Sequence, residues 1–225
     1  MSSEPQHSTG AGERPWDARL ARQLVEPLKD SWVTPNHLTS LRLLIGLAAA
    51  AAFIPGTYIW SNVASLLLVL SNFADHTDGE LARISGKSSR AGHIYDLASD
   101  AVVTILLFIG IGMGVGAKSA VVLGFPPLAL GAAAGSAIAV IFFLRMRIEE
   151  MAGKGATRQA ELSGFETEDV LYLLPLVTLC DAVAGFLLTA FICAPLFAIW
   201  VAIDYLRVMR RQRSTAASAT ARVAQ

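Results

Sequence analysis

Long stretches without a charged side chain most constrain how this chain can fold. Five apolar runs contain no aspartate, glutamate, lysine or arginine: 43–74, 101–117, 119–144, 170–180 and 182–203. A helix needs about 20 apolar residues to cross the hydrocarbon core of a bilayer, so such runs are typical of membrane spans. Charged residues make up only 16% of the chain, whereas about a quarter of a soluble domain is charged. The sequence therefore predicts an all-α membrane protein.

The runs resolve into six transmembrane helices. Pro55-Gly56-Thr57-Tyr58 interrupts the first run and predicts a tight turn between two spans. The second and fourth runs reach spanning length only if they include the polar residues that precede them. The predicted spans are 36–54, 58–83, 92–116, 119–147, 167–181 and 183–209, within a membrane domain over 34–212.

The positions of the basic residues predict an orientation. With the N-terminus inside, 17 of the 18 lysines and arginines fall at or near the cytoplasmic side, and Lys118 is the exception. This asymmetry is the positive-inside pattern. We therefore expect an integral protein of the cell (inner) membrane, with both termini in the cytoplasm.

The two ends of the chain differ from the membrane domain. Residues 1–14 are polar and are predicted to be disordered, and the Ser/Ala/Thr-rich segment 213–225 is predicted to be a flexible tail. Between them, 15–33 predicts an amphipathic helix lying in the membrane interface, with an ordinary packing helix as the alternative. Its apolar residues recur every four positions: Trp16, Leu20, Leu24, Leu28 and Trp32.

Four aspartates lie where a membrane protein can least accommodate charge. Asp75 and Asp78 are three residues apart, and Asp96 and Asp100 are four apart, so each pair shares one helix face. The polar stretch 85–90 predicts a hairpin bend, and Asp75 and Asp100 are equally far from its middle. An antiparallel hairpin thus brings all four carboxylates to similar depth.

Such a cluster requires a positive charge or protonation to neutralise it, and a divalent metal is the natural candidate. Each carboxylate within a span costs roughly 2.5–3.5 kcal/mol on insertion scales. Oxygen-only ligands favour Mg²⁺ or Mn²⁺. Four carboxylates can hold two ions, an arrangement used in phosphoryl chemistry. Gly79, Ala82 and Gly92 would let a bulky group approach the helices, although close helix packing is an alternative explanation.

The stretch from Asp75 to Asp100 reads D-x2-D-G-x2-A-R-x8-G-x3-D-x3-D. This resembles the signature of the CDP-alcohol phosphotransferase family, also called CDP-alcohol phosphatidyltransferases. The family has six spans preceded by a surface helix, and commonly a P-N-x-x-T segment, here 35–39 followed by Arg42.

The resemblance implies a transferase of phospholipid biosynthesis. An alcohol attacks a CDP-linked donor, usually CDP-diacylglycerol, and CMP leaves. Metal would be held by Asp75, Asp78, Asp96 and Asp100, and Asp100 would also act as general base. Nucleotide-binding positions would be Gly79, Ala82, Arg83 and Gly92, with Asn36 and Thr39 contributing.

The acceptor alcohol is less constrained by the sequence. The segment Asp-Gly-Glu-Leu-Ala-Arg resembles the inositol-type branches of the family, which implies inositol phosphate or another polyol as the acceptor. A cationic patch for a phosphorylated acceptor has five candidates: Lys87, Arg90, Arg145, Arg147 and Arg158. Positive-inside topology alone also explains these charges. His76 and His93 flank the aspartates as candidate supporting groups or ligands.

Other functions fit the sequence less well. Intramembrane carboxylates also occur in cation transporters, but we find no inverted repeat or broken helix. A di-iron site would need Glu-x-x-His pairs on helices, and the sequence around the four aspartates contains none. The zero net charge gives no indication of a nucleic-acid partner. Homodimerisation is common in the family that the motif resembles.

Overall fold

The computed structural model describes residues 16–122, 124–152 and 172–223. Helices form nearly all of this part of the chain, and no β-strand of two or more residues occurs within it. The helices are α1 (Trp16–Val25), the 3₁₀ turn η1 (Glu26–Leu28), α2 (Pro35–Phe53), α3 (Tyr58–Ser85), α4 (Arg90–Lys118), α5 (Pro127–Ala152), α7 (Leu174–Leu179) and α8 (Val183–Val223). The predicted all-α architecture is confirmed.

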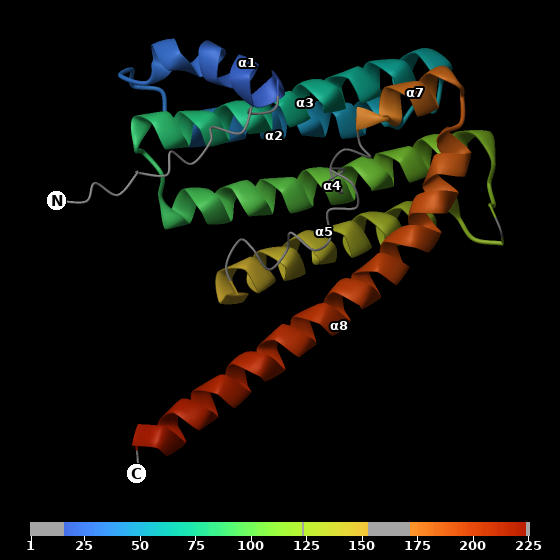
Figure 1. The fold of residues 1–225 in the computed structure, drawn as a ribbon. Coiled ribbons are helices and arrows are strands. Elements are labelled where there is room, and N and C mark those ends of the chain that lie inside the picture. The colour runs from blue at the N-terminus through green and yellow to red at the C-terminus, as the bar shows by residue number, and fades with distance from the viewer. Residues whose placement is uncertain (1–15, 123, 153–171, 224–225) are drawn as a thin grey trace.

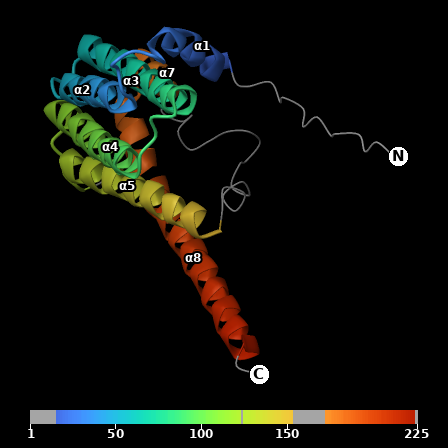
Figure 2. The same ribbon diagram turned by 90° about the vertical axis from the view of Figure 1, so that its left-hand side faces the viewer.

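The long helices pack side by side in the order α3, α2, α4, α5 and α8, which differs from their order in the chain. Helix α4 lies between α2 and α5, α3 packs against α2, and α8 packs against α5 and crosses the bundle obliquely (Figure 1). Buried apolar side chains from α2, α3, α4, α5, α7 and α8 form one continuous core. Seen from the side, α8 continues well past the other helices (Figure 2).

Within the described residues, four helices are long and apolar enough to cross a membrane: α2, α4, α5 and residues Val183–Gln212 of α8. Helix α3 has 28 residues, but its last third carries Asp75, Asp78 and Arg83. The predicted fifth span, 167–181, lies partly outside the described residues, and α7 covers six residues of it. Large apolar side chains remain exposed on several helices, including Leu44, Leu66 and Leu196. Exposed apolar surface of this extent fits a lipid environment.

Three boundaries differ from the predictions. The helix predicted over 15–33 ends at Val25, and a 3₁₀ turn containing Pro27 follows, because proline lacks the N–H that a continuing helix needs. Helix α5 begins at Pro127 rather than at 119, since Gly124 has a φ of +82° and Pro126-Pro127 favour a helix start. Helix α8 continues to Val223, beyond the start of the predicted tail.

Local chemistry sets the starts of α3 and α4 and the end of α3. The hydroxyls of Thr57 and Ser89 accept hydrogen bonds from backbone N–H groups at the starts of α3 and α4. Gly86 ends α3 with a φ of +65°, a conformation that favours glycine. The turn over 85–90 therefore forms as predicted and reverses the chain, but α2 packs between α3 and α4.

Close packing of α4 against α2 depends on a missing side chain. A Cβ on Gly110 would lie 2.2 Å from the carbonyl oxygen of Ala50, which is well inside van der Waals contact. Ser71 Oγ on α3 also donates to the carbonyl oxygen of Arg42 on α2. These contacts fix α2 against both α3 and α4.

Candidate metal centre

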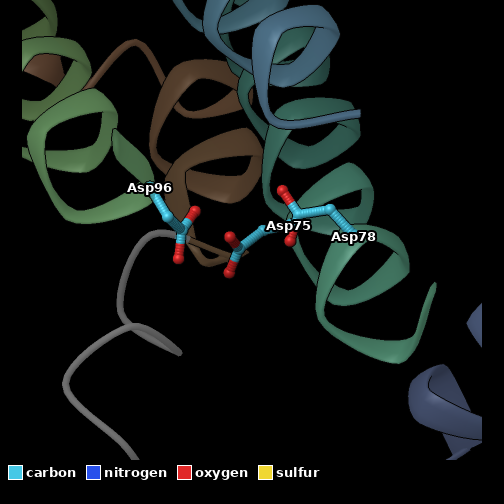
Figure 3. Close-up of side chains that lie close together, drawn as sticks. All are labelled: Asp75, Asp78 and Asp96. Carbon is cyan, nitrogen blue, oxygen red and sulfur yellow. The ribbon is translucent and has the colours of Figure 1, made fainter. Parts of the chain in front are cut away.

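Three of the four predicted aspartates converge on one point. Asp75 and Asp78 on α3 and Asp96 on α4 each place one carboxylate oxygen within 4.8 Å of the other two. In Figure 3 the carboxylates approach from the two helices and point toward one another. The pairing of helix faces predicted from the three- and four-residue spacings is therefore present in the structure.

The donor set fits a hard divalent cation. Two oxygens on one Mg²⁺ at about 2.1 Å lie roughly 3 to 4.2 Å apart, so rotations of the three carboxylates would suffice to close around an ion. All three donors are carboxylate oxygens, which favours Mg²⁺ or Mn²⁺ over zinc. The number of ions is not defined by this group.

Asp100 lies beside this group and shares a partner with it. Nη1 of Arg42 donates to Oδ1 of Asp75 and to Oδ1 of Asp100, each at 2.5 Å. The Asp100 side chain is 40% exposed, more than that of Asp75 at 32%. Asp100 thus combines contact with the cluster and access from outside it.

Arg42 was not assigned a role from the sequence, and the structure places it inside the cluster. Its side chain is 6% exposed, and Nη2 donates to Oδ1 of Asp96 at 2.8 Å in addition to the two bonds from Nη1. Nε of Arg42 has no hydrogen-bond partner among the described residues. A signal was available, because an arginine within an apolar span requires an acidic partner.

Thr39 contacts a predicted metal ligand rather than open space. Thr39 is buried, and its hydroxyl donates to Oδ2 of Asp78 at 2.7 Å. One turn earlier, the exposed Asn36 lies against α4, where a Cβ on Gly92 would come within 2.9 Å of Asn36 Oδ1. The P-N-x-x-T segment therefore joins α2 to both halves of the aspartate motif.

The other predicted nucleotide positions follow the aspartates along α3. A Cβ on Gly79 would meet nothing within 4 Å, so the helix has open space directly beside Asp78. Ala82 is half-buried. The side chain of Arg83 is 72% exposed, and its guanidinium pairs with the buried Glu80. Glu80 is a buried carboxylate that the motif did not single out.

A cavity adjoins the cluster on the side of Asp100. Its lining comes from α2, α3, α4, α5 and the residues before α7, and includes Asp75 and Asp100. The polar residues in the lining besides the cluster are Ser71, Asn72, His76, Thr104 and Tyr172. His93 is exposed on the first turns of α4 and does not line it.

The five candidate acceptor residues are dispersed, and none lines this cavity in the described structure. The ammonium group of Lys87 donates to the carbonyl oxygens of Ser31 and Val33. Arg90 is exposed at the start of α4. On α5, Arg145 is half-buried, and Arg147 pairs with Glu150 at 2.5 Å. Arg158 lies outside the described residues.

Comparison with known proteins gives the family context of this site. A family model described as CDP-alcohol phosphatidyltransferase matches residues 32–208. An archaetidylinositol phosphate synthase of Pyrococcus horikoshii is 31% identical over 102 residues, which are 45% of this chain and 52% of the relative. A bifunctional IPC transferase and DIPP synthase of Rubrobacter xylanophilus is 28% identical over 144 residues, 60% of this chain and 31% of the relative.

A vertebrate relative extends the range of similar proteins. Cholinephosphotransferase 1 of Danio rerio is 31% identical over 99 residues, 39% of this chain and 25% of the relative. The chain therefore spans about half the length of the Pyrococcus relative and less than a third of the other two.

Proposed function

The chain belongs to the CDP-alcohol phosphatidyltransferase family, and we propose that it transfers a substituted phosphate from a CDP-linked donor to an alcohol with release of CMP. The observation that carries this proposal is the convergence of Asp75, Asp78 and Asp96, all within the motif, on one point between α3 and α4. Family membership favours this transferase over the cation transporter that intramembrane carboxylates also allow.

Metal binding is the first task of the site. We propose that Asp75, Asp78, Asp96 and Asp100 hold Mg²⁺ or Mn²⁺, with two ions in the complete site. Bound divalent ions would neutralise the diphosphate of the donor and polarise the bond that breaks. Thr39 orients Asp78 through its hydrogen bond, so the ligand set is partly positioned before any ion binds.

The nucleotide half of the donor is placed next to α3 and the start of α4. The open space at Gly79 supports this placement, because a phosphate or ribose could approach the helix backbone there. The exposed guanidinium of Arg83 can donate paired hydrogen bonds to a phosphate. Ala82, Gly92 and Asn36 complete the proposed nucleotide site, to which the buried Thr39 contributes through its hydrogen bond to Asp78.

Asp100 is proposed to be the general base. It would take the proton of the acceptor hydroxyl while that oxygen forms a bond to the donor phosphorus that carries the donor's own alcohol group. The bond from this phosphorus to the oxygen of CMP then breaks, and CMP leaves with the electron pair. The exposure of Asp100 and the adjoining cavity support an acceptor approach from that side.

The acceptor is proposed to be an inositol phosphate or another polyol, and the donor to be CDP-diacylglycerol. Two of the similar proteins are named for inositol phosphate or IPC and DIPP chemistry, which supports this choice. A phosphate on the acceptor would meet the basic residues at the ends of α4 and α5 and in the following segment: Arg90, Arg145, Arg147 and Arg158.

We propose six membrane spans, with the site and both termini facing the cytoplasm in the inner membrane, and a homodimer as the assembly. Helix α1 packs along α3 but leaves Leu20 and Leu24 exposed at 42% and 54%. Exposed leucines on a helix that already contacts the bundle support its proposed position in the membrane interface.

An assay of CMP release tests the proposed reaction. Purified protein in detergent receives radiolabelled CDP-diacylglycerol, Mg²⁺ and one alcohol at a time from a panel of polyols and polyol phosphates. We expect CMP release that requires both Mg²⁺ and one of these alcohols. If no alcohol supports CMP release and the reconstituted protein carries Mg²⁺ across vesicle membranes, a transporter would be supported instead.

A further inference from the structure

Arg42 is positioned as part of the acidic cluster rather than as part of the surrounding helix packing. Its guanidinium reaches Oδ1 of Asp75, Asp96 and Asp100 at 2.5, 2.8 and 2.5 Å. The hydrogen bond from Ser71 Oγ to the carbonyl oxygen of Arg42 fixes the backbone at this point. The side chain thus extends from α2 into the space between α3 and α4.

The charge of the cluster changes with Arg42 in place. Four ionised aspartates carry four negative charges, and Arg42 cancels one of them. One divalent ion would then leave a net charge of −1, and two ions would give +1. Without Arg42, two ions would bring the four carboxylates to neutrality. Arg42 therefore weakens the attraction of the free cluster for divalent ions.

Arg42 and a divalent ion also share the same carboxylates. Asp75 and Asp96 belong both to the group of three converging oxygens and to the partners of Arg42. The guanidinium is held by its two terminal nitrogens, while Nε lacks a partner among the described residues. Its position therefore follows from the carboxylates, and it has lost one hydrogen bond in reaching them.

We propose that Arg42 is a built-in counter-cation of this cluster. It holds Asp75, Asp96 and Asp100 together when no divalent ion is bound, and a divalent ion binds in competition with it. The inference rests on the proposed metal-dependent function. It adds that the anionic donor and the divalent ion bind cooperatively, because the diphosphate supplies the negative charge that Arg42 has cancelled.

The test compares Mn²⁺ binding by detergent-purified full-length variants, measured from the electron paramagnetic resonance signal of the free ion. Arg42→Gln removes the charge, and Arg42→Lys keeps it. Arg210→Gln, on an exposed position of α8, is the matched control for loss of one positive charge. We expect Arg42→Gln to bind Mn²⁺ at least about ten-fold more tightly than the wild type. Arg42→Lys and Arg210→Gln should bind close to the wild-type affinity.

Thermal unfolding supplies a second measurement. In a chelator, Arg42→Gln should unfold at a lower temperature than the wild type, because three carboxylates have lost their counter-cation. Mn²⁺ should raise its unfolding temperature more than that of the wild type. The variant is expressed and purified with Mn²⁺ present, and failure to fold even then overturns the proposal, since the ion should replace the guanidinium.

The remaining outcomes separate this inference from the proposed function. If the wild type binds Mn²⁺ and Arg42→Gln binds it no more tightly, the proposed role of Arg42 is wrong, while the proposed metal-dependent function stands. Wild-type protein without saturable Mn²⁺ binding overturns the proposed metal-dependent function, and this inference with it.

Discussion

Thr39 on α2 donates a 2.7 Å hydrogen bond from Oγ1 to Oδ2 of Asp78 on α3. The same oxygen lies 3.2 Å from the carbonyl oxygen of Pro35, so its single proton has two candidate acceptors. The shorter bond goes to the charged group, and hydrogen bonds to charged groups are the stronger kind. Thr39 therefore positions a predicted metal ligand from a different helix.

Replacing Thr39 tests this positioning role. Thr39→Val keeps the shape of the side chain but removes the hydrogen bond, whose loss costs about 1.5–3 kcal/mol when one partner is charged. We expect a lower unfolding temperature and CMP release reduced about ten-fold or more at limiting Mg²⁺. Thr39→Ser, which keeps the hydroxyl, should retain most activity. Equal activity in Thr39→Val and the wild type would exclude the role.

The space beside Gly79 makes a second prediction. Alanine is preferred over glycine in a helix by up to about 1 kcal/mol, and a Cβ at Gly79 would meet no protein atom within 4 Å. Gly79→Ala should therefore unfold at the same or a higher temperature than the wild type. The methyl group would occupy the space proposed for the donor, so KM for CDP-diacylglycerol should rise several-fold or more.

Gly110→Ala is the matched control for this glycine. Its Cβ would lie 2.2 Å from the carbonyl oxygen of Ala50, so the helices must separate, at a cost of about 1–3 kcal/mol for overpacking. This variant should lose stability without a selective effect on KM for the donor. A Gly79→Ala variant that unfolds like Gly110→Ala, with an unchanged KM, would show that Gly79 serves packing instead.

The carboxylate of Asp96 should be indispensable for metal binding. Asp96→Asn keeps the size of the side chain but removes a negative charge from the group of three converging oxygens. We expect Mn²⁺ affinity and CMP release each to fall at least about 100-fold. Asp181→Asn is the control, because Asp181 is an exposed carboxylate paired with Lys118. An exposed pair contributes little, so this variant should resemble the wild type.

Lys87 is better explained as a tether than as an acceptor ligand. Its ammonium group donates to the carbonyl oxygen of Ser31 at 2.8 Å and so connects the segment before α2 to the α3–α4 turn. Lys87→Met should lower the free energy of unfolding by about 1 kcal/mol and leave KM for the acceptor nearly unchanged. A large rise in that KM at unchanged stability would instead support the acceptor role predicted from the sequence.

The aspartate pairs were predictable because they depend on local order. Helical spacing fixes which side chains share a face. The polar turn over 85–90 reverses the chain and so brings the two aspartate pairs to similar depth, although α2 packs between α3 and α4. Those two facts brought Asp75, Asp78 and Asp96 together without knowledge of any other contact. The motif resemblance then supplied the family, which the comparison over 32–208 confirms.

Arg42 was missed because its role depends on tertiary packing. The residue lies 33 positions before Asp75 and 58 before Asp100, and no local pattern states which neighbour an arginine of α2 will contact. The helix boundaries at Pro27 and Pro127 show the opposite case. Both follow from the known effects of proline on helix ends. The four-residue spacing over 15–33 and the uncharged run that begins at 119 both continue through a proline and so conceal these ends.

The fifth span and the acceptor site were beyond what the chain alone determines. The span predicted over 167–181 depends on polar residues for its length, and only its later part is described, as α7. The acceptor residues were chosen by charge, which positive-inside topology supplies at many positions for an unrelated reason. A cavity next to Asp100 is a property of five packed segments and has no counterpart in the sequence.

Anomalous X-ray scattering from Mn²⁺, in crystals grown with the ion and CDP-diacylglycerol, tests the central claim most directly. The account predicts an anomalous peak coordinated by carboxylate oxygens of Asp75, Asp78 and Asp96, next to the diphosphate of the donor. Ordered donor in the crystal with no Mn²⁺ peak between α3 and α4 would contradict it.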